Sequence, residues 1–288
     1  MFSRFICAVV LSGTVASMLV ASDEIMVIEQ DYNIIEQSKG GAQARDVRQK
    51  LYIHKDFICI DEFGGKQEQN APTESIMLDF KNRKIINLDH SLKKSVTESF
   101  DERRRRIESR KKQIESDLSD MAPGAQKTRA EKLYFALLDD KRRFALSKDP
   151  GADKTIGEAV CKQVKVIVED APEGAPFEAC LHPSLELPYD NTEVLYLLQI
   201  IGKRLAEFLH QNKETFKYVP MELHLDLAAG GRLDTKVIRV ALTDNSKLDF
   251  TSRGKLGSPF DVPTDYEERQ KKPGPKTEKN DGSQERPD

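Results

Sequence analysis

The sequence predicts an α+β domain in which a curved antiparallel sheet is covered by helices. Three observations favour this fold class: residues 25–99 follow a period of two, the pattern becomes helical at Phe100, and strand character returns from Ile156. Alternating apolar residues are typical of half-buried strands, whereas apolar residues three or four positions apart are typical of amphipathic helices. We therefore expect one sheet whose strands are interrupted by inserted helices.

The first 22 residues have the layout of a secretory signal peptide. Arg4 is followed by an uncharged, largely apolar run from Phe5 to Ala21, and Ser22 precedes the acidic pair Asp23-Glu24. A positive end, an apolar middle and small residues are the features of a cleaved leader. The alternative is an uncleaved anchor, but polar residues interrupt a run shorter than the ~20 apolar residues that span a membrane. We expect cleavage near Ser22 and an exported mature protein, periplasmic or secreted.

Short apolar runs separated by turn-prone residues follow the leader, at roughly ten-residue spacing. Such runs indicate an antiparallel meander, which we expect to form a curved sheet. The runs are Ile25–Ile35, Leu51–His54, Phe57–Ile60, Ile76–Phe80 and Ile85–Leu88, with a weaker one around Val96.

A helix is predicted from Phe100, because Phe100, Ile107, Ile114 and Met121 are spaced by seven. Pro123-Gly124 ends it. Cations concentrate between Arg103 and Lys112 and are answered by nearby carboxylates, which is the pattern of a solvated helix face with internal ion pairs. The same cations could instead bind an anionic partner or a membrane surface.

Two further helices are predicted, one over residues 127–146 and one from Thr192 to Asn212. Thr192 can cap the second of these, and apolar residues fill most of its circumference. A helix this apolar is expected to be buried or to cover an apolar surface. Strands are expected at Ile156–Val168 and Phe177–Leu187, and a hairpin from Met221 to Leu242.

The end of the chain changes in composition. After Pro263 it is rich in Lys, Glu, Pro and Gly and has no apolar run, so residues 264–288 are predicted to be a disordered charged tail. The expected organisation is a signal peptide over residues 1–22, a single domain over residues 23–263 and this tail.

Three cysteines, Cys59, Cys161 and Cys180, remain once Cys7 leaves with the leader. Cys161 and Cys180 flank a turn-rich stretch and could face each other across two strands. A bond between them would contribute about 3 kcal/mol for a loop of this length. The alternative is that all three are small apolar core residues. The strand pattern around Cys59 favours the second reading for that residue.

No constellation of residues in the sequence indicates catalysis, a metal or a cofactor. The five histidines are His54, His90, His182, His210 and His224, and no two have a ligand-like spacing with a carboxylate partner. His224 and Asp226 share a strand face without a third ligand. The net charge of −3 is far from the basic excess of a general nucleic-acid binder. We therefore expect a protein that is not an enzyme and does not bind nucleic acid.

Several segments resemble a family of exported bacterial proteins of unknown function that is similar to the periplasmic lipoprotein carriers LolA and LppX. The likeness spans roughly Ile25 to Tyr266. It is carried by Lys50–Asp56, Ile76–Ile85, Leu88–Lys94, Lys154–Gly157 with Cys161, and Ser258–Pro263.

The resemblance implies an open half-barrel whose apolar concave face is covered by helices and binds acyl chains. It implies that the helix from Thr192 to Asn212 is the cover, with Leu197, Leu198, Ile201 and Leu205 lining the ligand site. Its partners would be a lipid or a lipoprotein. The alternative hypothesis is an envelope scaffold that binds a protein partner through the Arg103–Lys112 helix and the charged tail.

Overall fold

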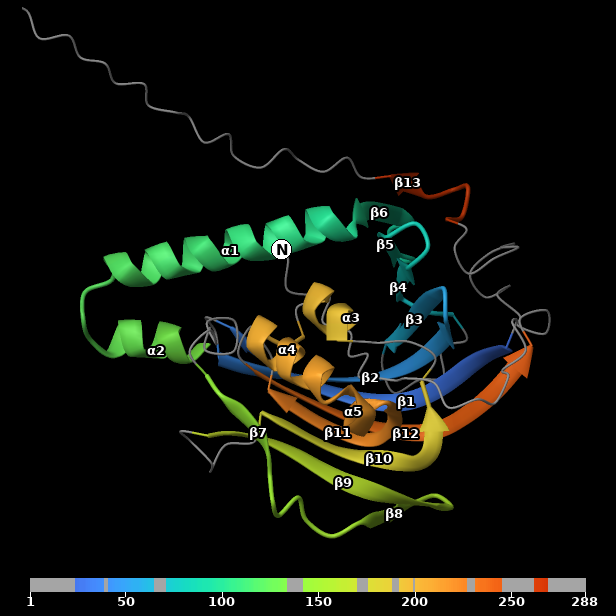
Figure 1. Ribbon diagram of the computed structural model, residues 1–288. Coiled ribbons are helices and arrows are strands. Elements are labelled where there is room, and N and C mark those ends of the chain that lie inside the picture. The colour runs from blue at the N-terminus through green and yellow to red at the C-terminus, as the bar shows by residue number, and fades with distance from the viewer. Residues whose placement is uncertain are drawn as a thin grey trace, which may run out of the picture.

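The computed structural model describes residues 24–38, 41–64, 71–133, 142–169, 176–187, 192–198, 200–226, 231–244 and 262–268. Its first part is the predicted meander (Figure 1). Every neighbouring pair in it is antiparallel, which confirms the expectation from the period of two. The strands are β1 (Glu24–Ser38), β2 (Gly41–His54), β3 (Phe57–Gly64), β4 (Glu74–Asp79), β5 (Lys84–Asp89) and β6 (Lys94–Ser99).

Helix α1 (Phe100–Asp120) follows β6 directly. Ser99 begins it with a capping box, in which Ser99 Oγ accepts from the Glu102 N–H and the Glu102 carboxylate accepts from the Ser99 N–H. The predicted seam is confirmed at Phe100, Ile107 and Ile114, which are buried, but Met121 is the C-cap beyond the helix end and is only partly buried.

The second predicted helix is only partly correct. Helix α2 (Ala125–Leu133) is present, but Phe144–Leu146 forms strand β7 and pairs with β9 (Ala159–Val168). Phe144, which was expected on the apolar side of this helix, lies on a short strand instead. An apolar run of this length fits either period.

A second antiparallel group completes the sheet. It contains β8 (Lys154–Ile156), β9, β10 (Phe177–Glu186), β11 (Tyr218–Asp226) and β12 (Gly231–Asp244). Three short helices, α3 (Thr192–Leu197), α4 (Lys203–Gln211) and α5 (Lys213–Phe216), are inserted between β10 and β11. The predicted hairpin is confirmed as β11 and β12.

The two groups join where β1 pairs with β12, so the sheet order is β13-β6-β5-β4-β3-β2-β1-β12-β11-β10-β9-β7, with β8 on β9. Strand β13 (Glu267–Glu268) is the one parallel neighbour among the described strands. The sheet is large, curved and unclosed (Figure 1). The half-barrel shape stays a prediction.

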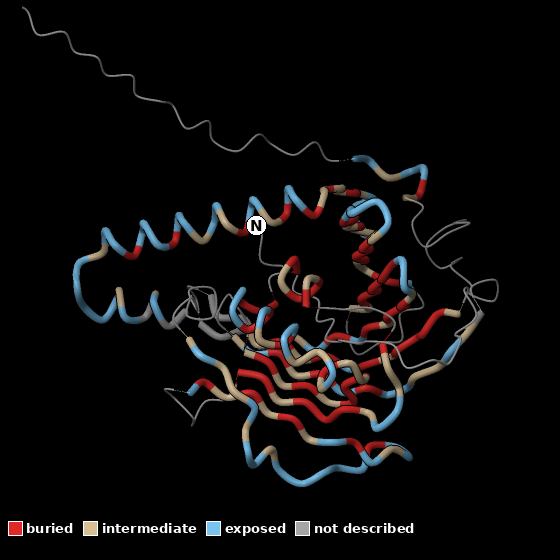
Figure 2. Tube along the Cα trace, viewed as in Figure 1, coloured by how far each residue is buried: buried red, intermediate tan, exposed pale blue. Residues whose placement is uncertain are grey.

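The two faces of the sheet differ. The face that we call the inner face packs against α3, α4 and α5 and forms the main hydrophobic core. The opposite, outer face carries a second apolar cluster over β1–β5, against which Val262 and Tyr266 pack. Buried positions therefore run along most strands (Figure 2). None of the helices in the described ranges is long and apolar enough to span a membrane.

Residues 264–268 were assigned to the disordered tail, yet the structure places them. Glu267 and Glu268 form β13 beside Lys94 and Ser95 of β6, and Tyr266 packs on the outer cluster. These five residues of the predicted tail contact the sheet through one aromatic side chain and two strand residues, and the rest of the tail stays a prediction. Residues 269–288 lie outside the described residues.

Candidate functional site

The four residues expected to line a ligand site lie together in the core between the helices and the inner face. Leu197 ends α3, Leu205 belongs to α4, and Leu198 and Ile201 lie between the two helices. Their exposed fractions are 0%, 1%, 1% and 4%, in the order Leu197, Leu198, Ile201 and Leu205. All four belong to the main core, together with inner-face residues of both strand groups. The structure therefore brings them together, packed against the sheet.

The continuous helix predicted from Thr192 to Asn212 is wrong. Helix α3 ends at Leu197 and α4 begins at Lys203, with Gly202 as its N-cap at φ −75° and ψ 166°. The described residues between them, Leu198 and 200–202, are not helical and are buried. Apolar residues around the whole circumference cannot all meet one sheet face from a straight helix, and the break lets both halves bury theirs.

A buried arginine of α1 fixes the end of α3. Arg103 donates from Nε to the backbone oxygen of Leu197 at 2.7 Å and from Nη1 to Glu98 Oε1 at 2.9 Å. Arg103 and Glu98 are 8% and 3% exposed. Arg106 also contacts Glu98 Oε1, at 2.7 Å. Since a buried guanidinium and carboxylate are stable only when paired, this cluster anchors α1 to β6 and to α3.

Contacts at the surface extend the same junction. Glu193 of α3 pairs with Arg104 of α1 and lies 3.6 Å from Arg83. The Tyr196 hydroxyl donates to Glu108 Oε1 at 2.6 Å. Every turn of α3 is thus held by a side chain of α1 or of the β4–β5 turn.

The arginine run of α1 was expected to be a solvated face with internal ion pairs or a site for an anionic partner. Three of its first four arginines, Arg103, Arg104 and Arg106, contact carboxylates of this chain. The long-range partner in α3 could not be read from the sequence, because it lies about ninety positions further along the chain. Arg105 is exposed.

A polar row crosses the inner face and was not found by sequence reasoning. Gln30 on β1 donates to Gln49 on β2 at 2.9 Å, and Gln49 donates to Glu62 on β3 at 3.1 Å. Arg45 reaches the other oxygen of Glu62 at 3.1 Å. The three residues Gln30, Gln49 and Glu62 are at most 6% exposed. The sequence shows only that each of these strands has a polar residue among its apolar ones. Which of these polar residues lie next to each other depends on the strand register, which the sequence does not show.

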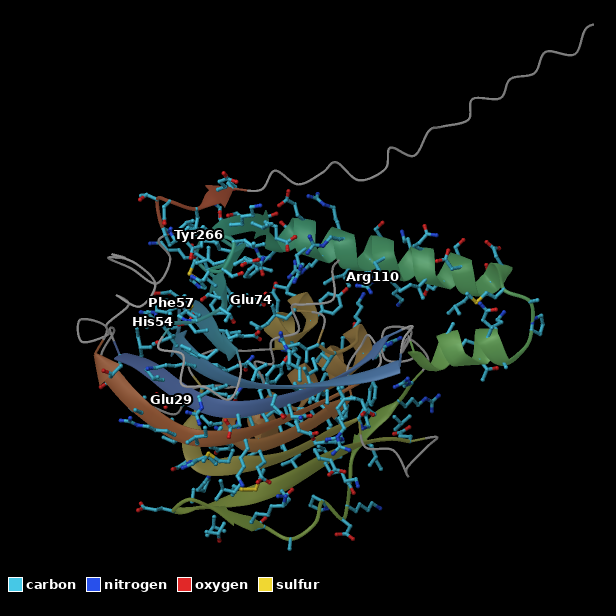
Figure 3. The ribbon with its side chains drawn as sticks, turned by 180° about the vertical axis from the view of Figure 1, so that it is seen from behind. Glu29, His54, Phe57, Glu74, Arg110 and Tyr266 are labelled. Carbon is cyan, nitrogen blue, oxygen red and sulfur yellow. A yellow bond between two sulfur atoms is a disulfide. The ribbon has the colours of Figure 1, made fainter. Side chains whose placement is uncertain are left out.

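A second hydrogen-bonded chain lies on the outer face. Ser75 Oγ is 2.5 Å from Asp61 Oδ1 and 2.7 Å from His90 Nε2, and His90 Nδ1 is 2.6 Å from the Tyr266 hydroxyl. With the proton on Nε2, each donor meets an acceptor: Tyr266 donates to His90, His90 to Ser75 and Ser75 to Asp61. Figure 3 shows Tyr266 beside β13, at the β6 end of the sheet.

This Ser–His contact does not form a nucleophile. The hydroxyl of Ser75 gives its proton to Asp61 rather than to His90, and Ser75 is 0% exposed. A nucleophilic serine needs a free lone pair, a base that takes its proton and access to substrate. The chain of contacts instead attaches the segment 262–268 to the sheet.

His224, which the sequence placed beside Asp226, pairs with Asp234 of β12 at 2.6 Å. Burial raises the pKa of Asp226, although His224 and Arg232 act in the opposite direction. In the described part of the chain, no group of three His, Cys, Asp or Glu residues is arranged to hold a metal ion.

The structure joins Cys161 to Cys180 in a disulfide, with Cα atoms 5.3 Å apart on β9 and β10. Cys59 is buried within the outer cluster, and its Sγ lies 3.9 Å from Asp61 Oδ1. The expected cleavage position at Ser22 lies outside the described residues.

No family model matches the sequence, and no curated protein matches it. Three similar solved structures are PNGF-II, an outer membrane lipoprotein-sorting domain from Vibrio parahaemolyticus and a LolA superfamily protein from Nitrosomonas europaea. Their sequence identities are 10%, 8% and 10%, and their TM-scores are 0.30, 0.29 and 0.28.

The matched region covers 85%, 81% and 78% of this chain, in the same order, and 31%, 89% and 88% of the others. The chain thus spans about a third of PNGF-II. One of the three is a LolA superfamily protein, the type that the sequence motifs resemble, and another is an outer membrane lipoprotein-sorting domain. At these TM-scores the likeness carries no argument about function.

Proposed function

We propose that this protein is an exported, non-catalytic carrier that binds the acyl chains of a lipid or lipoprotein between the inner face of the sheet and the α3–α4 segment. One observation carries the proposal. The apolar residues Leu198 and Ile201, outside either helix, belong to the core that this segment forms with a broad apolar sheet face, together with residues of α3 and α4. Part of what covers the inner face is therefore a stretch that is not helical.

The chemistry of this contact favours an acyl ligand. Leucine and isoleucine side chains lie against the sheet where a hydrocarbon chain would lie, and each methylene removed from water contributes about 0.8 kcal/mol. Helices α3 and α4 have six and nine residues, and helices this short depend on packing for stability. A ligand that took the place of their side chains on the sheet would therefore displace helices that have little stability of their own.

The alternative, an envelope scaffold that uses the α1 arginines, is less well supported. Arg103, Arg104 and Arg106 contact groups of the same chain, so binding a partner through them would release α3. A signal peptide over residues 1–22 and the periplasm or exterior as the site of action complete the proposal.

Native mass spectrometry of protein purified from the cell envelope, before and after organic extraction, tests the carrier. A released mass of lipid size supports it. A fluorescent fatty acid should bind the extracted protein, and Ile201→Phe, which adds bulk to the core between this segment and the inner face, should weaken binding by at least about tenfold. Ile86→Phe on the outer face is the matched control and should leave binding unchanged. Absence of both lipid and probe binding would contradict the proposal.

A further inference from the structure

The two edges of the sheet are covered in different ways. At one edge, β9 pairs with β7 and β8, which lie close to it in the chain, and Ser147 continues β7 by donating to the Lys165 oxygen at 2.9 Å. At the other edge, β6 is covered by β13, and 172 positions separate the contacting residues Lys93 and Asp265. An uncovered strand edge is a place where a further strand can be added. Residues 262–268, which we call the docked segment, therefore occupy the edge of β6.

The backbone of β6 presents hydrogen-bonding groups at this edge. Phe100 donates to the Arg83 oxygen at 2.9 Å, so in the antiparallel β5–β6 pair the backbone groups of Thr97 point away from β5. Strand β13 runs parallel to β6, and the Glu267 N–H donates to the Lys93 oxygen at 2.9 Å. Within the described ranges, β13 pairs with only two residues of β6, which has six. The edge is thus longer than the strand that covers it.

Side chains of the docked segment add three further contacts. The Tyr266 ring lies edge-on to the His90 ring, with centroids 5.7 Å apart, and its hydroxyl is 2.6 Å from His90 Nδ1. Val262 packs with Tyr266 against the outer cluster. Asp265 Oδ2 accepts from Lys93 Nζ at 2.7 Å. An apolar residue, an acidic residue and a tyrosine are therefore recognised at fixed spacing, next to a strand pairing.

The docked segment is held more weakly than the site that holds it. The side chains of Lys93 and Asp265 are 64% and 55% exposed, and exposed ion pairs contribute little to stability. Both residues of β13 are exposed. His90, in contrast, is fixed at 2.7 Å from Ser75 Oγ on β4, a strand with neighbours on both sides. The site is thus built on strands that do not depend on the docked segment.

We infer that the edge of β6 and the adjoining outer face form a peptide-binding site for a partner protein, and that the docked segment is its internal occupant. The partner is a segment with a tyrosine that bonds His90 and with acidic residues that face Lys93. The docked segment, Val-Pro-Thr-Asp-Tyr-Glu-Glu, shows which sequence fits. A partner with a longer strand also pairs with Thr97, and this contact favours it over the docked segment. The site does not depend on the proposed carrier function.

A fluorescent heptapeptide with the sequence of the docked segment, blocked at both ends, tests the site in the full chain. Tyr266→Ala removes the anchor of the internal occupant and should bind the peptide. Wild type should bind it at least about tenfold more weakly, because its own tethered segment competes. In wild type, an excess of unlabelled peptide should speed hydrogen exchange at the Glu267 amide. Near-UV circular dichroism shows whether Tyr266→Ala is folded, and the exchange measurement needs no variant.

Two matched pairs locate the binding. Lys93→Glu in the Tyr266→Ala background should weaken binding by about tenfold, because attraction to the acidic residues becomes repulsion. Lys81→Glu, at an exposed position of the turn between β4 and β5, should leave it unchanged. N-methylation of the peptide at the position of Glu267 removes the N–H that the Lys93 oxygen accepts and should also weaken binding by about tenfold. N-methylation at the position of Glu268, whose N–H points away from β6, is the control.

Absence of peptide binding to Tyr266→Ala, with unchanged exchange at Glu267 in wild type, would overturn the inference. Binding that persists with both Lys93→Glu and N-methylation at the Glu267 position would place the peptide elsewhere and overturn it as well. Light scattering addresses a further occupant, the docked segment of a second copy. Wild type should have the mass of one chain, and a dimer that excess peptide separates would replace the partner protein with strand exchange between copies.

Discussion

The outer face of the sheet differs between the two strand groups. Over β3–β5 and the adjoining ends of β1 and β2 it is apolar and buried, and the segment 262–268 packs on it. Further along β1 and β2 it carries the ion pairs Arg48–Asp31 and Lys50–Glu29. Over β9–β12 the same face carries ion pairs, with Lys154 and Lys236 on Glu222, Lys165 on Glu178, and His224 and Arg232 on Asp234. The residues of the apolar cluster are Ile25, Val27, Tyr52, Phe57, Cys59, Met77, Ile86 and Leu88.

One sheet is thus stabilised in two ways, by apolar burial on both faces and by apolar burial on one face with ion pairs on the other. Where the outer cluster covers β1–β5, these strands are core on both faces, so an apolar residue there contributes burial whichever way it points. Strands β9–β12 are core on the inner face only, and exposed ion pairs contribute little. The disulfide between Cys161 and Cys180 connects two strands of this one-sided group. We therefore expect the first group to resist unfolding more strongly.

The largest effect that would sharpen this contrast comes from Met77 on the outer face of β4, which is 0% exposed. Met77→Ala should lower the free energy of unfolding by about 2–5 kcal/mol, because it leaves a cavity in a buried cluster. Lys165→Ala, at an outer-face position of β9, is the matched control and should change it by less than about 1 kcal/mol. Urea denaturation measures both, and equal losses would remove the contrast.

Reduction of the disulfide should have the next largest effect. Removing the Cys161–Cys180 bond should lower the free energy of unfolding by about 3 kcal/mol, since the unfolded chain gains freedom. Urea denaturation with and without a thiol reductant measures the difference. Cys161→Ser with Cys180→Ser should show no further response to reductant, whereas Cys59→Ala should keep the full response.

Loss of the Tyr266 hydroxyl should have a smaller effect. Tyr266→Phe keeps the ring on the outer cluster and should lower the free energy of unfolding by about 1 kcal/mol, because His90 loses a hydrogen bond. Hydrogen exchange at Glu267, which donates to Lys93, should become faster. A protein in which this segment contributes nothing would show neither change.

The same contact has a pH dependence. Burial raises the pKa of Tyr266 above its ordinary value of 10.0, so the folded state favours the neutral hydroxyl. The stabilisation from Tyr266 should be complete below pH 10 and should disappear as the pH rises through the raised pKa. Urea denaturation of wild type and Tyr266→Phe between pH 8 and about 11 measures it, and a difference that grew with pH would contradict it.

The smallest expected effect lies on the charged half of the outer face. Burial raises the pKa of Asp226, so ionisation of this carboxyl opposes folding above that pKa. Asp226→Asn should stabilise the protein at pH 7 by up to about 0.5 kcal/mol, and the gain should vanish as the pH falls below the ordinary pKa of aspartate. Thermal melting at pH 7 and pH 3 measures it. Destabilisation by Asp226→Asn at pH 7 would show that the attraction of the Asp226 carboxylate to His224 and Arg232 outweighs the cost of its burial.

Much of the fold was readable from local patterns. The strands of the first meander, α1 with its buried seam and the β11–β12 hairpin follow from a period of two or of 3.6 and from turn residues between runs. Short or wholly apolar segments were not readable in this way. Phe144–Leu146 is a strand rather than a helix, and the helix expected from Thr192 to Asn212 breaks before Gly202.

The candidate site was readable in part for the same reason. Leu197, Leu198, Ile201 and Leu205 are buried as their apolar character suggests. The row of Gln30, Gln49 and Glu62 was not found, because its members are distant in the chain and meet only through strand register.

Local patterns in the sequence indicate which segments bury apolar side chains and, for the longer segments, where strands give way to helices, because these properties depend on residues a few positions apart. How those segments meet is set by the tertiary structure. It placed Arg103 against Leu197, Ser75 against His90 and Tyr266, and β1 beside β12. Such contacts join residues far apart in the chain, and their geometry is fixed by the register and packing of the whole sheet.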